Sequence, residues 1–198
     1  GSGYLFADWY QDIARYVPER KKWFTYDGRV WREDLGDLQV MELAKKLGNA
    51  LTIYALSLQD ENLKQDFMKY AAKWQRRGFR ETIIRDAASV WPIKHSAFDV
   101  DPFILNCLNG TLDLRTGGFY KHSASDLLSK LAGVRYDPQA TSDRWTRFIE
   151  EIMQGDQDKA EFLQKSLGYA LTGDTKHECF FILYGPKTRN GKGTSMET

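Results

Sequence analysis

The most constraining stretch of this sequence lies near its C-terminal end, where an apolar run meets a glycine-rich polar loop. Residues 179–184 are six consecutive apolar residues, a pattern typical of a strand that is buried on both faces of a sheet. The loop that follows, residues 185–194, reads Gly-Pro-Lys-Thr-Arg-Asn-Gly-Lys-Gly-Thr. A buried strand, a glycine loop, a lysine and a helix start, in that order, form the context of a phosphate-binding P-loop.

The P-loop interpretation gives the polar groups of this loop distinct roles. Backbone N–H groups of the glycine loop are expected to cradle phosphate, and Lys192 to reach the β- and γ-phosphates of ATP. The first hydroxyl after the lysine belongs to Thr194, which is therefore the candidate Mg²⁺ ligand. The expected ATP-binding set is Gly185, Asn190, Gly191, Lys192, Gly193 and Thr194.

The loop departs from the standard P-loop pattern at two points. Five residues rather than four separate Gly185 from the Gly191–Lys192 pair, and Gly193 stands where the Mg²⁺-binding hydroxyl is usual. Because one residue turns a helix by about 100°, Thr194 replaces that hydroxyl only in a reshaped loop. The alternative interpretation is a plain glycine turn between a core strand and a helix.

A P-loop NTPase also needs an acidic residue for Mg²⁺ and water, and often an arginine. No such residues follow Thr194 in a suitable place. We therefore expect this chain to be a piece of a longer protein, to contain no catalytic residue of its own and to lack ATPase activity alone.

Composition narrows the class of protein. The 198 residues allow one large domain or two small ones, and 42% apolar with 14% aromatic residues excludes a disordered chain. The net charge of +1 gives no global signal for nucleic acid, so any such site must come from local clustering. Cys107 and Cys179 lie far apart in apolar stretches, as reduced cysteines of a cytoplasmic protein do. No run reaches the roughly 18 apolar residues of a membrane span.

The pattern before the glycine loop predicts an α+β domain. Apolar residues at helical spacing predict helices over 4–17, 37–58, 61–75 and 79–90. Asp27-Gly28 between two aromatic runs predicts a β-hairpin, and turn residues within 103–122 predict a small β-meander. We expect residues 4–138 to form this domain. Residues 139–198 then form a helical lead-in, the first strand and the P-loop of a truncated α/β ATPase domain.

Positive charge is concentrated in one part of the predicted helices. Residues 64–85 carry seven basic and two acidic side chains. Five basic residues recur at spacings of three and four, so several share a helix face that can track the phosphates of DNA. These DNA-binding candidates are Lys69, Lys73, Arg76, Arg77 and Arg80. A solvated helix surface gives the same pattern, and both interpretations stay open.

The aromatic hairpin also allows two interpretations. Trp23 and Trp31 offer faces on which nucleic-acid bases can stack. Alternatively, the hairpin packs its aromatic side chains against a helix, which is the interpretation that we favour.

Three segments, in this order, resemble the phage and plasmid replication primase–helicases, of which the poxvirus primase–helicase is a distant member. The first is the hairpin from Trp23 to Trp31. The second, 105–117, is similar to the family's Asn-Gly-x-Leu-Asp-Leu-x-Thr-Gly signature. The third joins 167–173 to 181–194, where Arg-Asn-Gly-Lys-Gly-Thr is similar to a variant P-loop of phage members. Together they extend over nearly the whole chain.

This resemblance implies a function for the parent protein. Its ATPase half would belong to helicase superfamily three and would unwind DNA as a ring, usually a hexamer, powered by ATP and Mg²⁺. The chain would be the collar-like domain that precedes that motor, plus the start of the motor, in the cytoplasm of a bacterial host. Its expected partners are single-stranded or forked DNA and further copies of itself, with no membrane.

Two other classes of function stay open. One is a non-catalytic DNA-binding or oligomerisation module. The other is a small-molecule P-loop kinase, which predicts a P-loop close to the N-terminus, because the mononucleotide fold usually begins with it. Here roughly 180 residues precede the loop, which disfavours the kinase.

Overall fold

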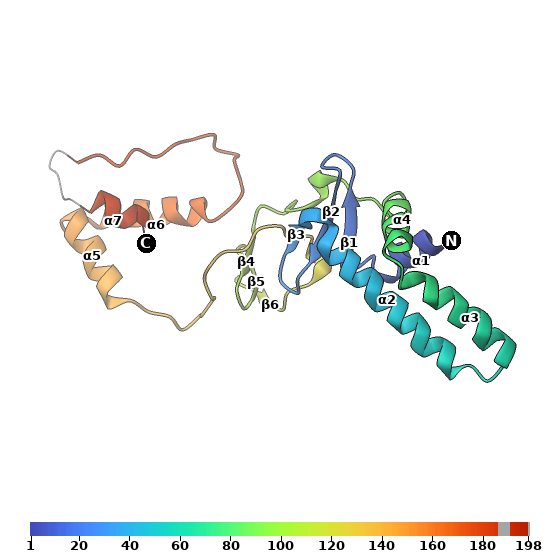
Figure 1. The fold of residues 1–198 in the computed structure, drawn as a ribbon. Coiled ribbons are helices and arrows are strands. Elements are labelled where there is room, and N and C mark those ends of the chain that lie inside the picture. Colours follow the sequence, from blue (N-terminus) through green and yellow to red (C-terminus); the bar gives the residue numbers. More distant parts are fainter. Residues whose placement is uncertain (186–190, 198) are drawn as a thin grey trace. The chain divides into compact units, whose positions relative to one another are not determined.

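The computed structural model describes residues 1–185 and 191–197, and within them the fold is α+β. These residues form seven α-helices and two antiparallel sheets of three strands each (Figure 1). The chain divides into two compact units. Unit 1 comprises residues 1–100 and 121–133, and unit 2 comprises residues 101–120 and 134–198. The division that the sequence predicts, between residues 138 and 139, stays a prediction.

Unit 1 combines four α-helices with one sheet. Its elements in chain order are α1 (Ser2–Trp9), β1 (Ala14–Val17), β2 (Lys22–Tyr26), β3 (Trp31–Glu33), α2 (Leu38–Ser57), α3 (Glu61–Trp74) and α4 (Arg77–Ala87). The sheet order is β1-β2-β3, and short 3-10 turns lie at Leu35–Asp37, His95–Ala97 and Ala124–Asp126. Helices α2, α3 and α4 confirm three of the predicted helices to within a few residues.

The hairpin predicted at Asp27-Gly28 is confirmed. Tyr26 pairs with Trp31, and the Asp27 carboxylate accepts hydrogen bonds from the backbone N–H groups of Arg29 and Val30 at 2.9 and 3.0 Å. Gly28 takes a φ of +97°, which a residue without a side chain adopts without strain. Trp23 and Trp31 are only 4% and 2% exposed, so the packing interpretation holds and neither ring offers a face to bases.

The helix predicted over 4–17 is wrong in its second half. Helix α1 ends at Trp9, and Ala14–Val17 instead forms β1, which pairs with Lys22–Thr25 of β2. Pairing with β2 satisfies the backbone of this segment and buries Val17 in a cluster with Phe24. The helical spacing of the aromatic residues in this segment was therefore overridden by a tertiary contact.

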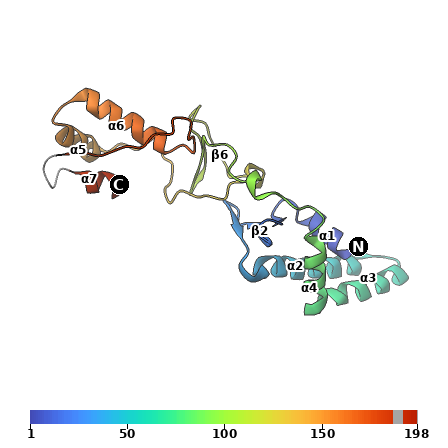
Figure 2. The ribbon, with the colours of Figure 1, turned by 90° about the horizontal axis from the view of Figure 1, so that it is seen from above.

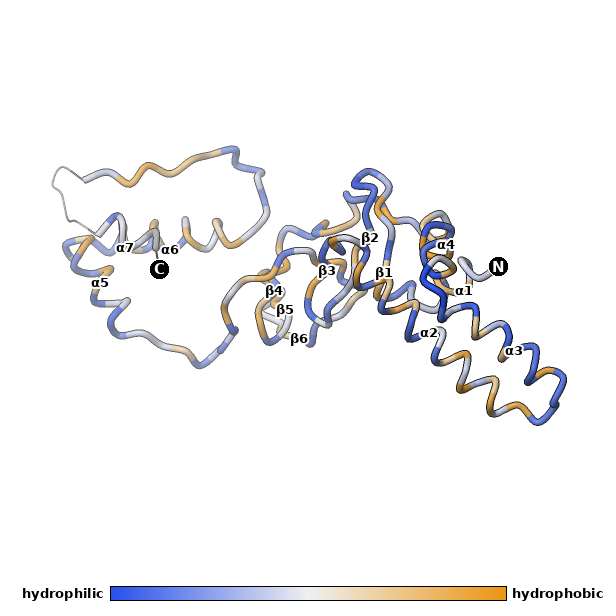
Figure 3. Tube along the Cα trace, viewed as in Figure 1, coloured by the Kyte–Doolittle hydropathy of each residue, from blue (hydrophilic) through white to orange (hydrophobic). Residues whose placement is uncertain are grey.

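The main core of unit 1 lies where α2 meets the other helices and the sheet. Its largest buried side chains include Phe6 of α1, Trp23 of β2, Leu47 of α2 and Trp74 of α3. Apolar residues alternate with polar ones along α2 and α3 (Figure 3). The two helices lie side by side in Figures 1 and 2 and approach most closely at Gly48, where a Cβ atom would stand 2.7 Å from Cβ of Trp74.

Unit 2 begins with the predicted β-meander. Strands β4 (Ile104–Cys107), β5 (Gly110–Asp113) and β6 (Phe119–Tyr120) pair in antiparallel order. Three helices follow: α5 (Asp143–Met153), α6 (Gln157–Ala170) and the short α7 (Lys192–Glu197). The Ser142 side chain caps the start of α5, because its hydroxyl accepts from the N–H of Trp145 at 3.2 Å.

The buried strand predicted over 179–184 is not formed. This segment lies outside any strand, and its aromatic side chains are exposed, for example Phe180 at 83% and Tyr184 at 85%. A strand of a parallel sheet needs hydrogen-bonding neighbours and cover on both faces. Among the described residues no strand pairs with this segment, so its apolar side chains have no sheet in which to be buried as a strand.

No helix within the described residues has the length and apolar character needed to cross a membrane.

Replacing Gly48 with alanine tests the close approach of α2 and α3. We expect Gly48→Ala to lower the free energy of unfolding by about 1–3 kcal/mol, because the added methyl group must push Trp74 away. Gly168→Ala in α6 is the matched control: nothing lies within 4 Å of its Cβ position. There, alanine should leave stability unchanged or raise it by up to about 1 kcal/mol. Urea unfolding followed by circular dichroism measures both, and equal effects would contradict the packing.

Removing the carboxylate of Asp34 tests the start of α2. Asp34 is 3% exposed and accepts from the N–H groups of Gln39 and Val40 at 3.0 and 2.9 Å, while its own N–H donates to the Trp23 carbonyl at 2.8 Å. We expect Asp34→Ala to cost about 1–2 kcal/mol of unfolding free energy, because the buried N–H of Val40 and the partly buried N–H of Gln39 lose their acceptor. Asp60→Ala removes the exposed cap of α3 and should cost less; a larger loss there would contradict the assignment.

Candidate functional site

The predicted basic face falls on two helices that meet at a sharp bend. Helix α3 ends at Trp74 and α4 begins at Arg77, with Arg76 between them in an extended conformation (φ −83°, ψ 126°). The helix therefore breaks before Gly78, and Gly78 lies in the first turn of α4. We call residues 73–80 the α3–α4 elbow. Spacings of three and four across the elbow do not define one helix face.

The structure separates the five predicted DNA contacts into four exposed residues and one buried residue. The exposed side chains are those of Lys69, Lys73, Arg76 and Arg77. Arg80 is only 8% exposed, and its guanidinium donates through Nη1 to the Trp74 carbonyl at 2.7 Å and through Nε to the Met41 sulfur at 3.5 Å. Arg80 is therefore not on the exposed face where the sequence analysis placed it.

The exposed cations at the elbow have few acidic neighbours. Lys69 pairs with Asp66 at 3.5 Å, and Arg77 pairs with Glu81 at 2.7 Å. All four side chains are well exposed, and such pairs are weak in water, so a phosphate group can compete for these cations. For Lys73 and Arg76 the described part of the chain shows no ion pair within 4 Å. The elbow thus presents positive charge that the protein itself leaves largely uncompensated.

Helix α2 adds two lysines that the sequence analysis missed. The Gln75 side chain at the elbow donates to the Asn49 side chain of α2 at 3.3 Å, and Lys45 and Lys46 lie one helical turn before Asn49. Lys45 pairs with Glu42 on its own helix. The short connection between α2 and α3 predicts that the two helices are neighbours, but it does not fix their register. Sequence alone therefore could not place Asn49 beside Gln75.

The described part of the predicted nucleotide loop consists of Gly185 and the residues from Gly191 onward; Asn190 lies outside the described residues. Helix α7 begins at Lys192, directly after Gly191, which has a φ of +82°. A Cβ atom at Gly191 would stand 2.6 Å from Cγ2 of Ile152, so only glycine fits there. Thr194 is exposed. A positive-φ glycine followed by a lysine at a helix start has the order of a P-loop, whereas Gly193 stands where that motif has its Mg²⁺-binding hydroxyl.

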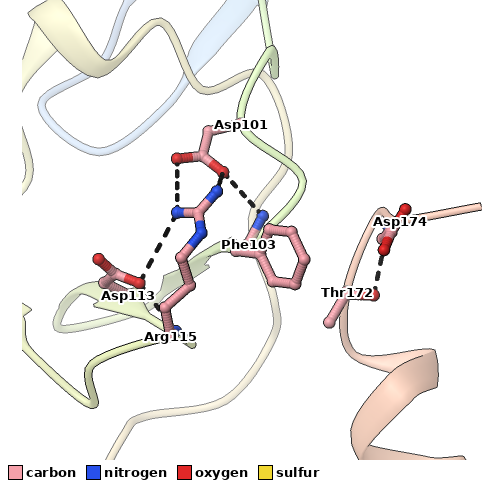
Figure 4. Close-up of polar contacts among 6 residues, drawn as sticks. All are labelled: Asp101, Phe103, Asp113, Arg115, Thr172 and Asp174. Carbon is pink, nitrogen blue, oxygen red and sulfur yellow. Dashed lines mark hydrogen bonds and ion pairs between the residues drawn. The ribbon is translucent and has the colours of Figure 1, made fainter. Parts of the chain in front are cut away.

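The signature segment of the meander is organised around Arg115. Its guanidinium donates to both carboxylate oxygens of Asp101 at 2.9 and 2.6 Å, lies 3.9 Å from Asp113 and sits 4.3 Å from the centre of the Phe103 ring (Figure 4). The hydrogen bonds from Arg115, together with one from the N–H of Phe103, lower the pKa of Asp101. Arg115 occupies a variable position of the signature, whereas the signature residue Asp113 accepts a hydrogen bond from the backbone N–H of Arg115 at 2.8 Å and so has a structural role in the turn.

The same segment is joined to the end of α6. The N–H of Gly173 donates to the Pro102 carbonyl at 2.7 Å. Beside it, the N–H of Asp174 donates to the Thr172 hydroxyl at 3.2 Å (Figure 4). The meander and the helix that leads toward the glycine loop are therefore tied by a backbone hydrogen bond.

Comparison with known proteins identifies the family. The family model described as D5 N terminal like matches residues 3–154, which is more than half of the chain. No curated protein matches the chain at a significant level. The matched region contains the aromatic hairpin and the signature meander, two of the three segments that carry the resemblance, and it confirms that resemblance; the third segment, which ends in the glycine loop, lies beyond residue 154. The chain therefore belongs to the D5 N-terminal-like family, the domain of phage and poxvirus primase–helicase proteins.

Proposed function

We propose that this chain is part of an ATP-dependent DNA helicase of the primase–helicase type, used in phage or plasmid DNA replication. The observation that carries the proposal is the family match over residues 3–154, followed in the same chain by the glycine loop at 185–194. In this proposal unit 1 is the domain that precedes the motor, and the glycine loop is the motor's phosphate-binding turn. The chain alone does not hydrolyse ATP.

The nucleotide half of the proposal assigns roles to three residues. Lys192 holds the β- and γ-phosphates of ATP, and Thr194 supplies the hydroxyl for Mg²⁺. Gly191 allows the turn that directs backbone N–H groups toward phosphate. Hydrolysis of ATP supplies the free energy for loosening one subunit interface of a hexamer and shifting the bound DNA.

The DNA half of the proposal rests on the elbow. Lys73, Arg76 and Arg77 are exposed and lie within five residues of one another across the bend. Because phosphates repeat along a DNA strand, a compact group of cations favours the backbone of single-stranded or forked DNA without reading its sequence.

A second candidate function is a non-catalytic DNA-binding or oligomerisation module. The observation that favours it is that unit 1 contains a core of its own and the elbow. A small-molecule kinase receives no support, since the matched family is the domain of primase–helicases.

Replacing Lys192 tests the nucleotide half. In the full-length protein, we expect Lys192→Ala to abolish ATP hydrolysis, because the charge that stabilises the transferred phosphate is lost. Lys165→Ala, which removes an exposed lysine of α6 that pairs with Glu161, is the control and should keep turnover. A steady-state phosphate-release assay measures both variants. Undiminished turnover in Lys192→Ala would remove the P-loop assignment.

Reversing charges at the elbow tests the DNA half. We expect the double variant Lys73→Glu, Arg76→Glu to weaken binding of the chain to single-stranded and forked DNA. Losing two phosphate contacts should also reduce the slope of log K against log salt by about 1.4–1.8. The matched control reverses two exposed lysines of α6, Lys159 and Lys165. Fluorescence anisotropy at several salt concentrations gives affinity and slope, and equal effects of the two double variants would exclude the elbow as the DNA contact.

A further inference from the structure

Arg80 is a buried cation that makes no ion pair within 4 Å among the described residues, although its charge is one of those that lower the pKa of Glu42 on α2. Its side chain begins on α4, donates to the backbone carbonyl of Trp74 at the end of α3, and contacts the sulfur of Met41 on α2. Burying a charge is costly unless polar groups compensate it. Because Arg80 makes its compensating contacts to α3 and α2, it constrains how α2, α3 and α4 meet.

The Trp74 carbonyl is a suitable acceptor for that charge. The last carbonyl groups of a helix lack intrahelical donors and carry the negative end of the helix dipole. Arg80 thus caps the C-terminus of α3 from inside α4, and the N–H of Arg80 closes the first turn of α4 by donating to the Arg76 carbonyl at 3.2 Å. Arg80 therefore makes one hydrogen bond to the end of α3 and one to the residue that precedes α4.

Several contacts hold the bend. The rings of Trp74 and Phe79 lie edge to face across it with centroids 6.0 Å apart, and Gln75 bonds to Asn49 of α2. No side chain caps the N-terminus of α4, and a Cβ atom at Gly78 would meet nothing within 4 Å. The hydrogen bond from Arg80 joins α4 directly to the last carbonyl of α3, so it contributes to the direction in which Arg76 and Arg77 project.

We propose that Arg80 is a positioning residue, which locks the α3–α4 elbow so that Lys73, Arg76 and Arg77 face a nucleic-acid phosphate backbone together. It does not bind phosphate itself. This inference rests on the proposed DNA-binding function, and it replaces the role that the sequence analysis gives to Arg80. A lysine cannot substitute, because its single ammonium group cannot reproduce the two donors that the planar guanidinium directs toward Trp74 and Met41.

The lock itself is tested without DNA. Hydrogen–deuterium exchange of the intact chain reports opening of the backbone at residues 75–79. We expect exchange there to rise by about tenfold in both Arg80→Lys and Arg80→Met, while β2 in the core keeps its protection. Arg85→Lys and Arg85→Met, at an exposed position of the same helix, are the matched controls and should exchange as the unmodified chain does. Unchanged exchange at the elbow in the Arg80 variants would overturn the lock.

DNA binding then separates positioning from direct contact. If Arg80 positions the elbow, Arg80→Lys and Arg80→Met weaken binding to a similar extent, since both lose the bridge. If Arg80 binds phosphate, Arg80→Lys keeps the affinity, and Arg80→Met lowers the salt slope by about 0.7–0.9; that result would overturn the inference. Absence of DNA binding by the unmodified chain would overturn the proposed DNA contact, and the exchange experiment shows separately whether the lock exists. Arg80→Lys carries the test if Arg80→Met fails to fold.

Discussion

The close packing of α2 against α3 at Gly48 is the constraint on which the arrangement of unit 1 depends. Because Gly48 has no side chain, Trp74 reaches the α2 backbone and fills the core at the end of α3. Trp74 is also the last residue of α3, and Arg80 donates to its carbonyl. The packing at Gly48 and the bend that carries the basic residues therefore share one tryptophan.

The elbow illustrates how a fold separates charges of the same type into different roles. Arg76 and Arg80 are four residues apart, a spacing that places both on one face of a continuous helix. The break after Trp74 directs Arg76 into solvent and Arg80 into the interior. The buried Arg80 then supports the backbone that carries the exposed Arg76 and Arg77. The positive surface therefore has a defined shape that flexible lysines on an unbroken helix would lack.

Local patterns predicted much of this fold. Long amphipathic repeats predicted α2, α3 and α4, and Asp27-Gly28 predicted its hairpin, since each depends on residues close in sequence. The wrong predictions concern segments whose structure depends on distant partners. Ala14–Val17 is a strand because β2 pairs with it. Residues 179–184 are not a strand, because no strand among the described residues pairs with them. For the candidate site, sequence found the basic residues. It could not find the contact of Gln75 with Asn49 of α2 or the burial of Arg80, which depend on how the helices pack.

The salt dependence of DNA binding by the unmodified 198-residue chain tests the central claim most directly. Binding to single-stranded and forked DNA, measured across a range of salt concentrations with the mass in solution recorded alongside, gives the number of phosphates contacted. With three or four cations engaged, we predict that log K falls linearly with log salt, with a slope of about −2 to −4. No binding, or an affinity independent of salt, would contradict the claim that unit 1 carries a phosphate-binding surface.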